Sequence, residues 1–398
     1  MSACVGGLAC GATKDERGHF PARSSGFFLL SLNLLHPPPT SRSPAAWEAA
    51  DFPDPAAYTT VLFAAHLAEL EALAATVAAD TPIHTVALTP ARRGLAPTLG
   101  PLLEAIAAEV RDGRGFALLK GMPVSPSSPW ATTLRYWLVG LFWGAGRANN
   151  QSGHLVGHIA DVGADPADPN TRLYATAAAQ PWHNDSADAV SLLCVGTAAS
   201  GGGSGWASSR AIHDALVVED PPAARLLAAR GAWFYDRKGE VPAGKAGFFE
   251  MPVFNYGEGG CADRVFVNLS SNYYEAAAAR FPGRVPPLTA AQRAAVAKVE
   301  AMAASPRFAL ACDLAPGDVQ LLNNHTVLHT RAAFTNDATH TRHLLRLWLS
   351  SPLDPPLPPV YRELYGSEGL VPGDRGGIRV DGVKLRAEDL YVPLSPGG

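Results

Sequence analysis

The chain has 398 residues, 47% of them hydrophobic, and its formal net charge is −4 at pH 7. This length and composition can bury a large core and predict a soluble protein, most simply one large domain with insertions. The nearly balanced charge, without a Lys/Arg-rich block, argues against a nucleic-acid partner, and no apolar stretch reaches the ~20 residues of a membrane span.

The first 45 residues predict a leader that stands apart from the fold. They contain Ser, Gly and Arg but only two acidic residues, Asp15 and Glu16, which fits a transit peptide, a disordered leader or a gene-model artefact. The five cysteines show neither a CxxC pair nor a zinc spacing, and this odd, unpatterned number indicates a reducing compartment. We therefore expect a cytoplasmic protein, or a plastid or mitochondrial one if the leader is a transit peptide.

Helices and strands are predicted throughout the following domain, residues 46–365. Apolar residues recur at helical spacing in five segments, which are 56–79, 99–111, 128–140, 211–230 and 289–304. Pro221-Pro222 should split the fourth of these helices, and Thr289 is a suitable N-cap for the fifth. Apolar or alternating runs predict strands at 116–122, 155–159, around His183, 190–195, 232–235, 248–254, 264–269, 308–314, 319–322, 326–329 and 343–349.

Many short strands with helices at one side predict a fold that is mainly β with flanking helices (α+β). Its core is expected to be a double-stranded β-helix, the jelly-roll of cupin-like proteins. The pairing of the strands cannot be assigned, because register is not readable from one sequence. Residues 366–398, which are rich in Gly and Pro, are expected to form a C-terminal extension.

The segment His183-Asn184-Asp185 places two kinds of metal ligand one residue apart. On a strand, residues i and i+2 point to the same face, and Pro181 just before the segment is tolerated at a strand start. Two imidazoles and one carboxylate can hold Fe(II) as a facial triad and leave its other positions open. A surface turn would also explain His-x-Asp, so this interpretation depends on a third ligand from elsewhere.

The candidate third ligand is His329, which follows the β-branched and apolar run Thr326-Val327-Leu328 on a predicted strand. His325, in the same segment, is the alternative. His154 and His158 are spaced i, i+4, but their surroundings indicate a strand or loop, so ordinary packing is the favoured interpretation.

Two arginines, Arg342 and Arg346, fall on one face of the predicted strand at 343–349 or directly before it. Burying a guanidinium inside a barrel is costly unless an anion meets it. The planar guanidinium also fits a carboxylate bidentately. A dicarboxylate co-substrate would supply such an anion.

Four blocks in this order resemble the taurine dioxygenase-like (TauD/TfdA) family of Fe(II)- and 2-oxoglutarate-dependent oxygenases. The blocks are Pro181 to Ser186, Gly201 to Ser209, Asn323 to Arg331 and Arg342 to Trp348. The resemblance is closest to the eukaryotic branch, through Gly113 to Phe116 and Leu344 to Trp348, and it spans about residues 45 to 365.

The resemblance implies Fe(II), 2-oxoglutarate and O2 as cofactors and a role for each residue of the site. The iron ligands would be His183, Asp185 and His329. Arg342 and Ser204 would bind the distal carboxylate of 2-oxoglutarate. The residues that contact the primary substrate would be Arg346, Asn150 and Gln151. Arg346 fits a structural role equally well, and Asn150-Gln151 fits an ordinary polar turn equally well.

The expected activity is oxidation, most simply hydroxylation, of a C–H bond in a small anionic metabolite, with release of succinate and CO2. Two alternatives stay open, a catalytically silent cupin-like binding protein and a peptide hydroxylase of the same chemistry. The intact triad together with Arg342 favours the oxygenase, since a binding protein has no reason to keep all four groups. The expected partner is a small molecule, without nucleic acid or membrane, and homo-oligomerisation is left open.

Overall fold

The computed structural model describes residues 42–79, 81–366 and 369–379. Nearly all of the predicted leader, and residues 380–398 of the predicted C-terminal extension, lie outside this description. No helix within the described residues is long and apolar enough to cross a membrane.

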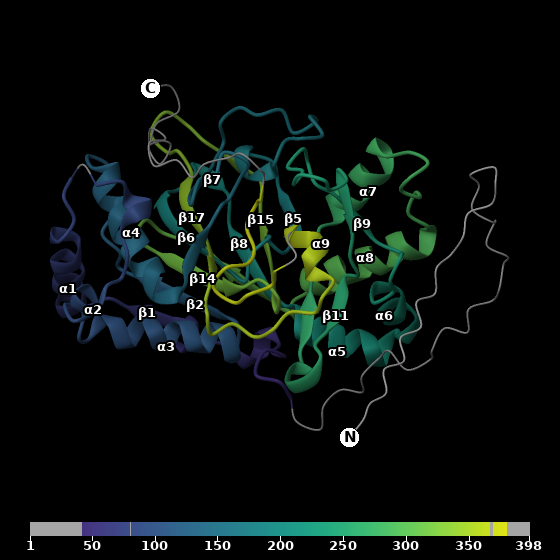
Figure 1. Ribbon diagram of the computed structural model, residues 1–398, viewed down its shortest axis with the longest axis horizontal. Coiled ribbons are helices and arrows are strands. Elements are labelled where there is room, and N and C mark those ends of the chain that lie inside the picture. The colour runs from purple at the N-terminus through teal and green to yellow at the C-terminus, as the bar shows by residue number, and fades with distance from the viewer. Residues whose placement is uncertain (1–41, 80, 367–368, 380–398) are drawn as a thin grey trace, which may run out of the picture. The chain divides into compact units, whose positions relative to one another are not determined.

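Two sheets face each other and form the centre of the fold (Figure 1). The larger sheet has the order β1 (Thr59–Val61), β2 (Phe116–Lys120), β14 (Val319–Asn323), β6 (Ala189–Gly196), β17 (His343–Ser350), β3 (Ala145–Arg147), with β4 (Val156–Ala160) also on β17. The smaller sheet has the order β13 (Ala309–Cys312), β8 (Ser204–Ser208), β15 (Val327–Arg331), β5 (Gln180–His183). Apart from the parallel pair β1–β2, these strands are antiparallel, and the predicted jelly-roll core is confirmed.

Three short pairs of strands complete the β structure. They are β9 (Phe234–Asp236) with β10 (Phe248–Glu250), β11 (Phe254–Tyr256) with β12 (Val265–Val267), and β7 (Ser200–Gly201) with β16 (Phe334–Thr335). The strand predicted at 248–254 is therefore wrong as one element. Pro252 interrupts it, since proline cannot donate a ladder hydrogen bond, and β10 and β11 pair with different partners.

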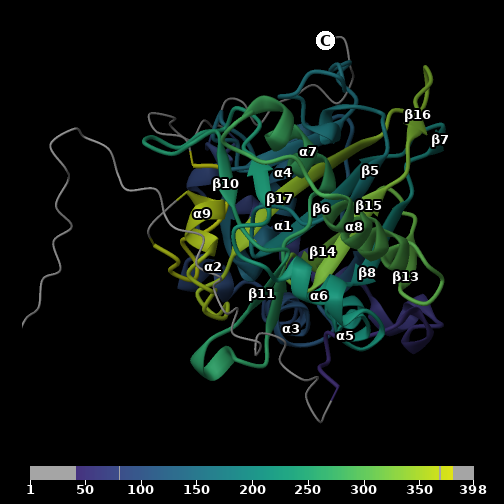
Figure 2. The same ribbon diagram turned by 90° about the vertical axis from the view of Figure 1, so that its right-hand side faces the viewer.

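Helices cover the outer face of each sheet. On the larger sheet lie α3 (Leu99–Asp112) and α4 (Pro129–Trp143), and α1 (Ala64–Ala75) packs against both of these helices. The short α2 (Pro90–Arg93) lies between α1 and α3 in the chain. Beside the smaller sheet lie α5 (Ser209–Glu219), α6 (Pro221–Leu227), α7 (Ser271–Arg280) and α8 (Ala290–Ala303), and the short α9 (Tyr361–Tyr365) packs near β10 (Figure 2). The split at Pro221 and the N-cap at Thr289 are as predicted.

The helix predicted at 56–79 is wrong in its first third. Residues 59–61 form β1, and the helix begins only at Ala64. Thr59-Thr60-Val61 is β-branched, which favours an extended backbone, and a parallel pairing with β2 satisfies that backbone. Tertiary pairing thus outweighs the helical periodicity of the apolar residues.

Alternation along β17 divides its side chains between two environments. Leu345, Leu347 and Leu349 pack outward in the core shared with α3 and α4. Arg346 and Trp348 point the other way, toward the space between the sheets. Because successive strand residues face opposite sides, this one strand both anchors the helical layer and brings a cation into the barrel.

Candidate metal centre

Two paired strands of the smaller sheet bring the predicted triad together. His329 on β15 lies directly opposite His183 on β5, and their ring centroids are 4.2 Å apart. Asp185 follows the end of β5, so its carboxylate turns back toward both rings. His183 Nε2 lies 3.7 Å from Asp185 Oδ1, and His329 Nε2 lies 4.0 Å from Asp185 Oδ2.

The donor set of this triad fits a divalent transition metal. One ligand atom from each of His183, Asp185 and His329 lies within 4.8 Å of the others. His183 Nδ1 is 2.8 Å from the carbonyl oxygen of Pro181, a contact that fixes the tautomer and leaves Nε2 as the metal donor. Two imidazoles and one carboxylate are the ligands of non-haem Fe(II) sites with open positions.

The surrounding charges keep the triad in the protonation state that binds a metal. Burial alone would raise the pKa of Asp185, but the charge of Arg346, followed by those of the two histidines, lowers it well below the usual range. Burial lowers the pKa of His183 and brings that of His329 to about 3. The carboxylate is therefore ionised and both imidazoles are neutral near pH 7.

Asp185 is held by two side chains from the inward face of β17. Trp348 Nε1 donates to Asp185 Oδ2 over 2.8 Å, and Arg346 Nη1 lies 3.3 Å from the same oxygen. Arg346 Nε in turn donates to Asn149 Oδ1 over 2.7 Å. The guanidinium of Arg346 also lies over the Tyr174 and Trp348 rings, 4.9 and 4.4 Å from their centroids. Arg346 thus connects the metal ligand to the barrel wall.

A small cavity beside the triad is lined by two buried arginines, Arg342 and Arg331, together with Ser204. Arg342 Nη1 and the Nε and Nη1 atoms of Arg331 are buried without a hydrogen-bond partner among the described residues. The two guanidinium carbons lie 5.3 and 5.0 Å from the centroid of one ring, that of Phe334. Burial lowers the pKa of each arginine only to about 10, so both remain cations. Two buried cations with unused donors form a site for a dianion.

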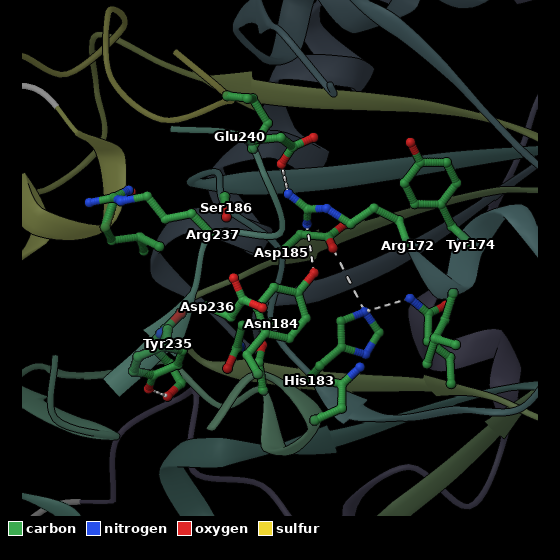
Figure 3. A pocket seen from close by; sticks show the side chains of 18 of the residues that line it. Arg172, Tyr174, His183, Asn184, Asp185, Ser186, Tyr235, Asp236, Arg237 and Glu240 are labelled. Carbon is green, nitrogen blue, oxygen red and sulfur yellow. Dashed lines mark hydrogen bonds and ion pairs between the residues drawn. The ribbon is translucent and has the colours of Figure 1, made fainter. Parts of the chain in front are cut away.

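A larger cavity, about 910 Å³ with its open mouth included, reaches the triad from another direction. Figure 3 shows His183 and Asp185 next to each other among the residues that line it, with Arg172 extending toward Glu240. Arg172 also donates to the Tyr273 hydroxyl over 2.7 Å. His183, Asp185 and Arg346 line both cavities, so the triad lies where the two spaces meet.

The other predicted site residues lie elsewhere. Asn150 and Gln151 occupy the turn between β3 and β4 and are not among the residues lining either cavity. Asn150 Nδ2 contacts His154 Nδ1 at 3.0 Å, whereas its neighbour Asn149 contacts Arg346. His325 lies outside the triad, with its Nε2 2.9 Å from Asp188 Oδ1.

The sequence matches the family model "Taurine catabolism dioxygenase TauD, TfdA family" over residues 86–348. The chain belongs to the TauD/TfdA family. It is therefore an oxidoreductase, a dioxygenase that uses Fe(II), 2-oxoglutarate and O2. Two sequence relatives are FR-33289 synthase of Streptomyces rubellomurinus, 29% identical over 80% of this chain and 92% of its own, and taurine hydroxylase-like protein SAT17 of Stachybotrys chartarum, 28% identical over 76% and 77%.

Solved structures with the same fold include two oxygenases. Asparagine oxygenase in complex with Fe(II), 2S,3S-3-hydroxyasparagine and succinate has a TM-score of 0.53 at 18% identity, covering 73% of this chain and 93% of its own. The non-haem iron oxygenase OrfP in complex with Fe, succinate and (3S)-hydroxy-L-Arg has a TM-score of 0.52 at 15% identity, covering 73% and 94%. These similarities confirm the jelly-roll architecture of the TauD/TfdA chain.

A glycine supports the predicted co-substrate arginine. Gly202 has φ of +79°, and its carbonyl oxygen accepts a hydrogen bond from Arg342 Nε over 3.3 Å. A Cβ at this position would lie 2.8 Å from Arg342 Cδ and Nε. The close approach of backbone and guanidinium thus requires a residue without a side chain.

Gly202→Ala is expected to displace Arg342 and weaken 2-oxoglutarate binding about tenfold, equivalent to about 1.4 kcal/mol. Anaerobic titration with 2-oxoglutarate measures this affinity. The matched control is Gly283→Ala, which imposes the same backbone strain at φ of +77° where the added methyl would meet open space. Equal affinities for the two variants would contradict the proposed contact.

A buried polar cluster centred on Asp188 lies directly behind the metal-binding segment. Ser350 Oγ donates to Asp188 Oδ2 over 2.6 Å, and Arg375 Nε lies 3.0 and 2.9 Å from the two carboxylate oxygens. His325 completes the cluster. Asp188 was not predicted, because nothing near it in the sequence shows that its partners come from β17, the turn before β15 and the C-terminal extension.

Asp354 lies next to this cluster, and its pKa is raised from 3.8 to about 7 by burial, followed by the nearby charge of Asp188. The folded state therefore holds a proton that the unfolded state releases, and stability falls as pH rises from 3.8 to about 7. Asp354→Asn removes this loss and should stabilise the chain more at pH 8 than at pH 5, by on the order of 2 kcal/mol. Thermal unfolding at both pH values checks this; an equal gain at both would contradict it.

Two buried cysteines lie near the end of the barrel that carries Arg342 and Ser204. Cys194 lines a cavity that also touches Arg342, and Cys312 ends β13. Burial raises the pKa of the Cys194 thiol to about 11 and that of Cys312 to about 12. Both are free thiols.

Proposed function

We propose that this TauD/TfdA dioxygenase hydroxylates a small metabolite carrying an anionic group, and releases succinate and CO2. The observation that carries the proposal is the meeting of two cavities at one triad. The arginine-lined cavity suits a dicarboxylate, and the larger cavity suits a second, separate molecule.

The arginines of the smaller cavity would hold 2-oxoglutarate in this proposal. Arg342 and Ser204 take its distal carboxylate, as the family resemblance implies, and Arg331 adds a second buried cation from the same strand as His329. Arg331 and His329 are two residues apart and so share a face of β15. The unused donors of both guanidinium groups support this arrangement.

The anionic group of the primary substrate is assigned to the larger cavity. Within the described part of the chain, two of its arginines already have carboxylate partners, since Arg172 pairs with Glu240 and Arg346 with Asp185. Arg237 donates instead to the main-chain oxygens of Ala246, Glu363 and Leu364. An anion at Arg237 would supply the counter-charge that carbonyl groups provide only partly.

The residues of the site orient the metal ligands and the reactants, and the bound cofactors supply the oxidation chemistry. The chemistry that Fe(II) and 2-oxoglutarate supply when bound is activation of O2, with one oxygen atom entering the substrate and the other entering succinate. Trp348 and Arg346 orient the Asp185 carboxylate, and Pro181 fixes the ring of His183. The buried walls of the two cavities hold both reactants in place and exclude bulk water.

The test is a coupled measurement on the purified chain with Fe(II) and 2-oxoglutarate. Candidate carboxylates, sulfonates, phosphonates and amino acids are screened for a product heavier by one oxygen atom, formed in equal amount to succinate. A catalytically silent binding protein would bind 2-oxoglutarate without forming succinate. Oxidation of a substrate without consumption of 2-oxoglutarate would overturn the proposal.

A further inference from the structure

The C-terminal extension returns to the metal-binding segment through one buried side chain. Arg375 is fully buried, and its Nε pairs with both carboxylate oxygens of Asp188, three residues after Asp185. Arg375 Nη2 also donates to the Pro355 carbonyl over 2.7 Å. The carboxylate and carbonyl oxygens around Arg375 offset the cost of burying its guanidinium.

The two residues after Gly376 hydrogen-bond to both sides of the site. Gly377 N donates to the Ser186 carbonyl over 2.7 Å, immediately after Asp185. Ile378 N donates to the Ala148 carbonyl over 2.9 Å, immediately before Asn149. Asp185 and Asn149 are the residues that hold Arg346 from opposite sides of its guanidinium. The extension therefore ties together the two segments that orient the Asp185–Arg346 pair.

Close packing fixes the path of the extension at this point. Gly377 has φ of +76°, and a Cβ there would lie 2.9 Å from Arg147 Cβ and 3.0 Å from Ala148 N. The side chain of Ile378 then forms part of the wall of the larger cavity, together with Leu364. The extension thus lines the larger cavity and also holds the segment that carries the metal ligand Asp185.

We propose that residues 369–379 are a positioning element of the active site, with Arg375 as the residue that fixes the Asp185 segment through Asp188. This inference rests on the proposed function. Arg375 touches neither the triad nor the two cavities and acts through Asp188, while the backbone of Gly377 and Ile378 holds Ser186 and Ala148. Groups that hydrogen-bond directly to a metal ligand change metal affinity or activity by about 10- to 100-fold when removed. Arg375 acts one step further out, so a smaller loss of about three- to tenfold is expected.

Strand β17 holds the same segment as Arg375 does, through two further hydrogen bonds. Trp348 and Ser350 are neighbours on one face of β17; the first donates to Asp185 and the second to Asp188. Without Arg375, Asp188 keeps Ser350 and His325 but loses its counter-cation. We therefore expect residues 184–188 to loosen locally while the two sheets keep their structure.

The test compares Arg375→Met with wild type in the full chain. Iron affinity is measured by anaerobic titration with Fe(II), and local opening by amide hydrogen exchange. The expected result is an iron affinity lowered about three- to tenfold, below the range for a direct partner of a metal ligand. Exchange should be faster in peptides covering 145–150, 184–190 and 369–379 and unchanged in α8. Arg375→Lys keeps the charge without the planar fork and should restore part of the protection.

The matched control is Arg307→Met, which lies outside this segment. Arg307 pairs with Glu219 over 2.9 Å while both side chains are about half exposed, so its loss should leave iron affinity and exchange as in wild type. If Arg375→Met does not fold, Arg375→Lys carries the test. The inference is overturned if the variant binds iron like wild type, or if exchange rises equally in α8, which would indicate general destabilisation. Failure of the wild type itself to bind Fe(II) and 2-oxoglutarate would instead count against the proposed function.

Discussion

Asp185→Ala is expected to abolish iron-dependent turnover. The substitution removes the only carboxylate of the triad and leaves two imidazoles, which hold Fe(II) poorly without an anionic ligand. The loss of activity should exceed about 100-fold, the upper end of what removal of an outer partner costs. It is measured as succinate formed from 2-oxoglutarate, together with anaerobic Fe(II) binding.

Two further variants distinguish loss of the metal-binding carboxylate from loss of the hydrogen bond that orients it. Asp185→Asn keeps an oxygen that can accept from Trp348 and Arg346 but removes the charge, so it should be nearly as inactive as Asp185→Ala. Trp348→Phe keeps the carboxylate and removes only the 2.8 Å hydrogen bond to it, so a smaller loss of about tenfold is expected. Full activity of Asp185→Asn would show that this carboxylate does not bind the metal.

Arg342→Met is expected to weaken 2-oxoglutarate binding by about 2–5 kcal/mol, the usual cost of removing one partner of a buried charge pair. That is roughly 30-fold or more in the dissociation constant. The physical reason is that Arg342 is 5% exposed and has a buried, unused Nη1 donor in the cavity beside the triad. Anaerobic titration of the iron-loaded chain with 2-oxoglutarate measures the change.

The control is Arg284→Met, which removes another arginine stacked on a phenylalanine ring, but an exposed one. It should bind 2-oxoglutarate like wild type. Arg342→Met should also retain wild-type affinity for Fe(II) alone, since Arg342 is not a metal ligand. An unchanged affinity for 2-oxoglutarate would remove Arg342 from the co-substrate site and leave Arg331 as the candidate.

The triad could be predicted because its signal is local. His183-x-Asp185 needs only the two-residue period of a strand, and the run before His329 predicts the second strand from its β-branched residues. The choice of His329 over His325 comes from the family resemblance. The structure places the three side chains together through the direct pairing of His183 with His329. That pairing itself could not be predicted, since nothing in either strand specifies the register.

What sequence reasoning missed depends on long-range contacts. Arg375 and Asp188 are separated by 187 positions, and no periodicity links a residue in a Gly-rich extension to a residue beside a metal motif. Arg331 had a usable signal, because it follows His329 by two and so shares its face. Asn149, rather than Asn150 or Gln151, contacts Arg346, and the conformation of a polar turn decides which neighbour points inward.

The protonation state of the two buried thiols bears on whether they are oxidised in an enzyme that uses O2. Oxidation of cysteine proceeds through the thiolate and requires access. With pKa values raised to about 11 and 12, Cys194 and Cys312 stay protonated near pH 7 although Cys194 lies beside Arg342. Each thiol therefore lacks the thiolate form through which oxidation proceeds, although Cys194 shares a cavity with Arg342.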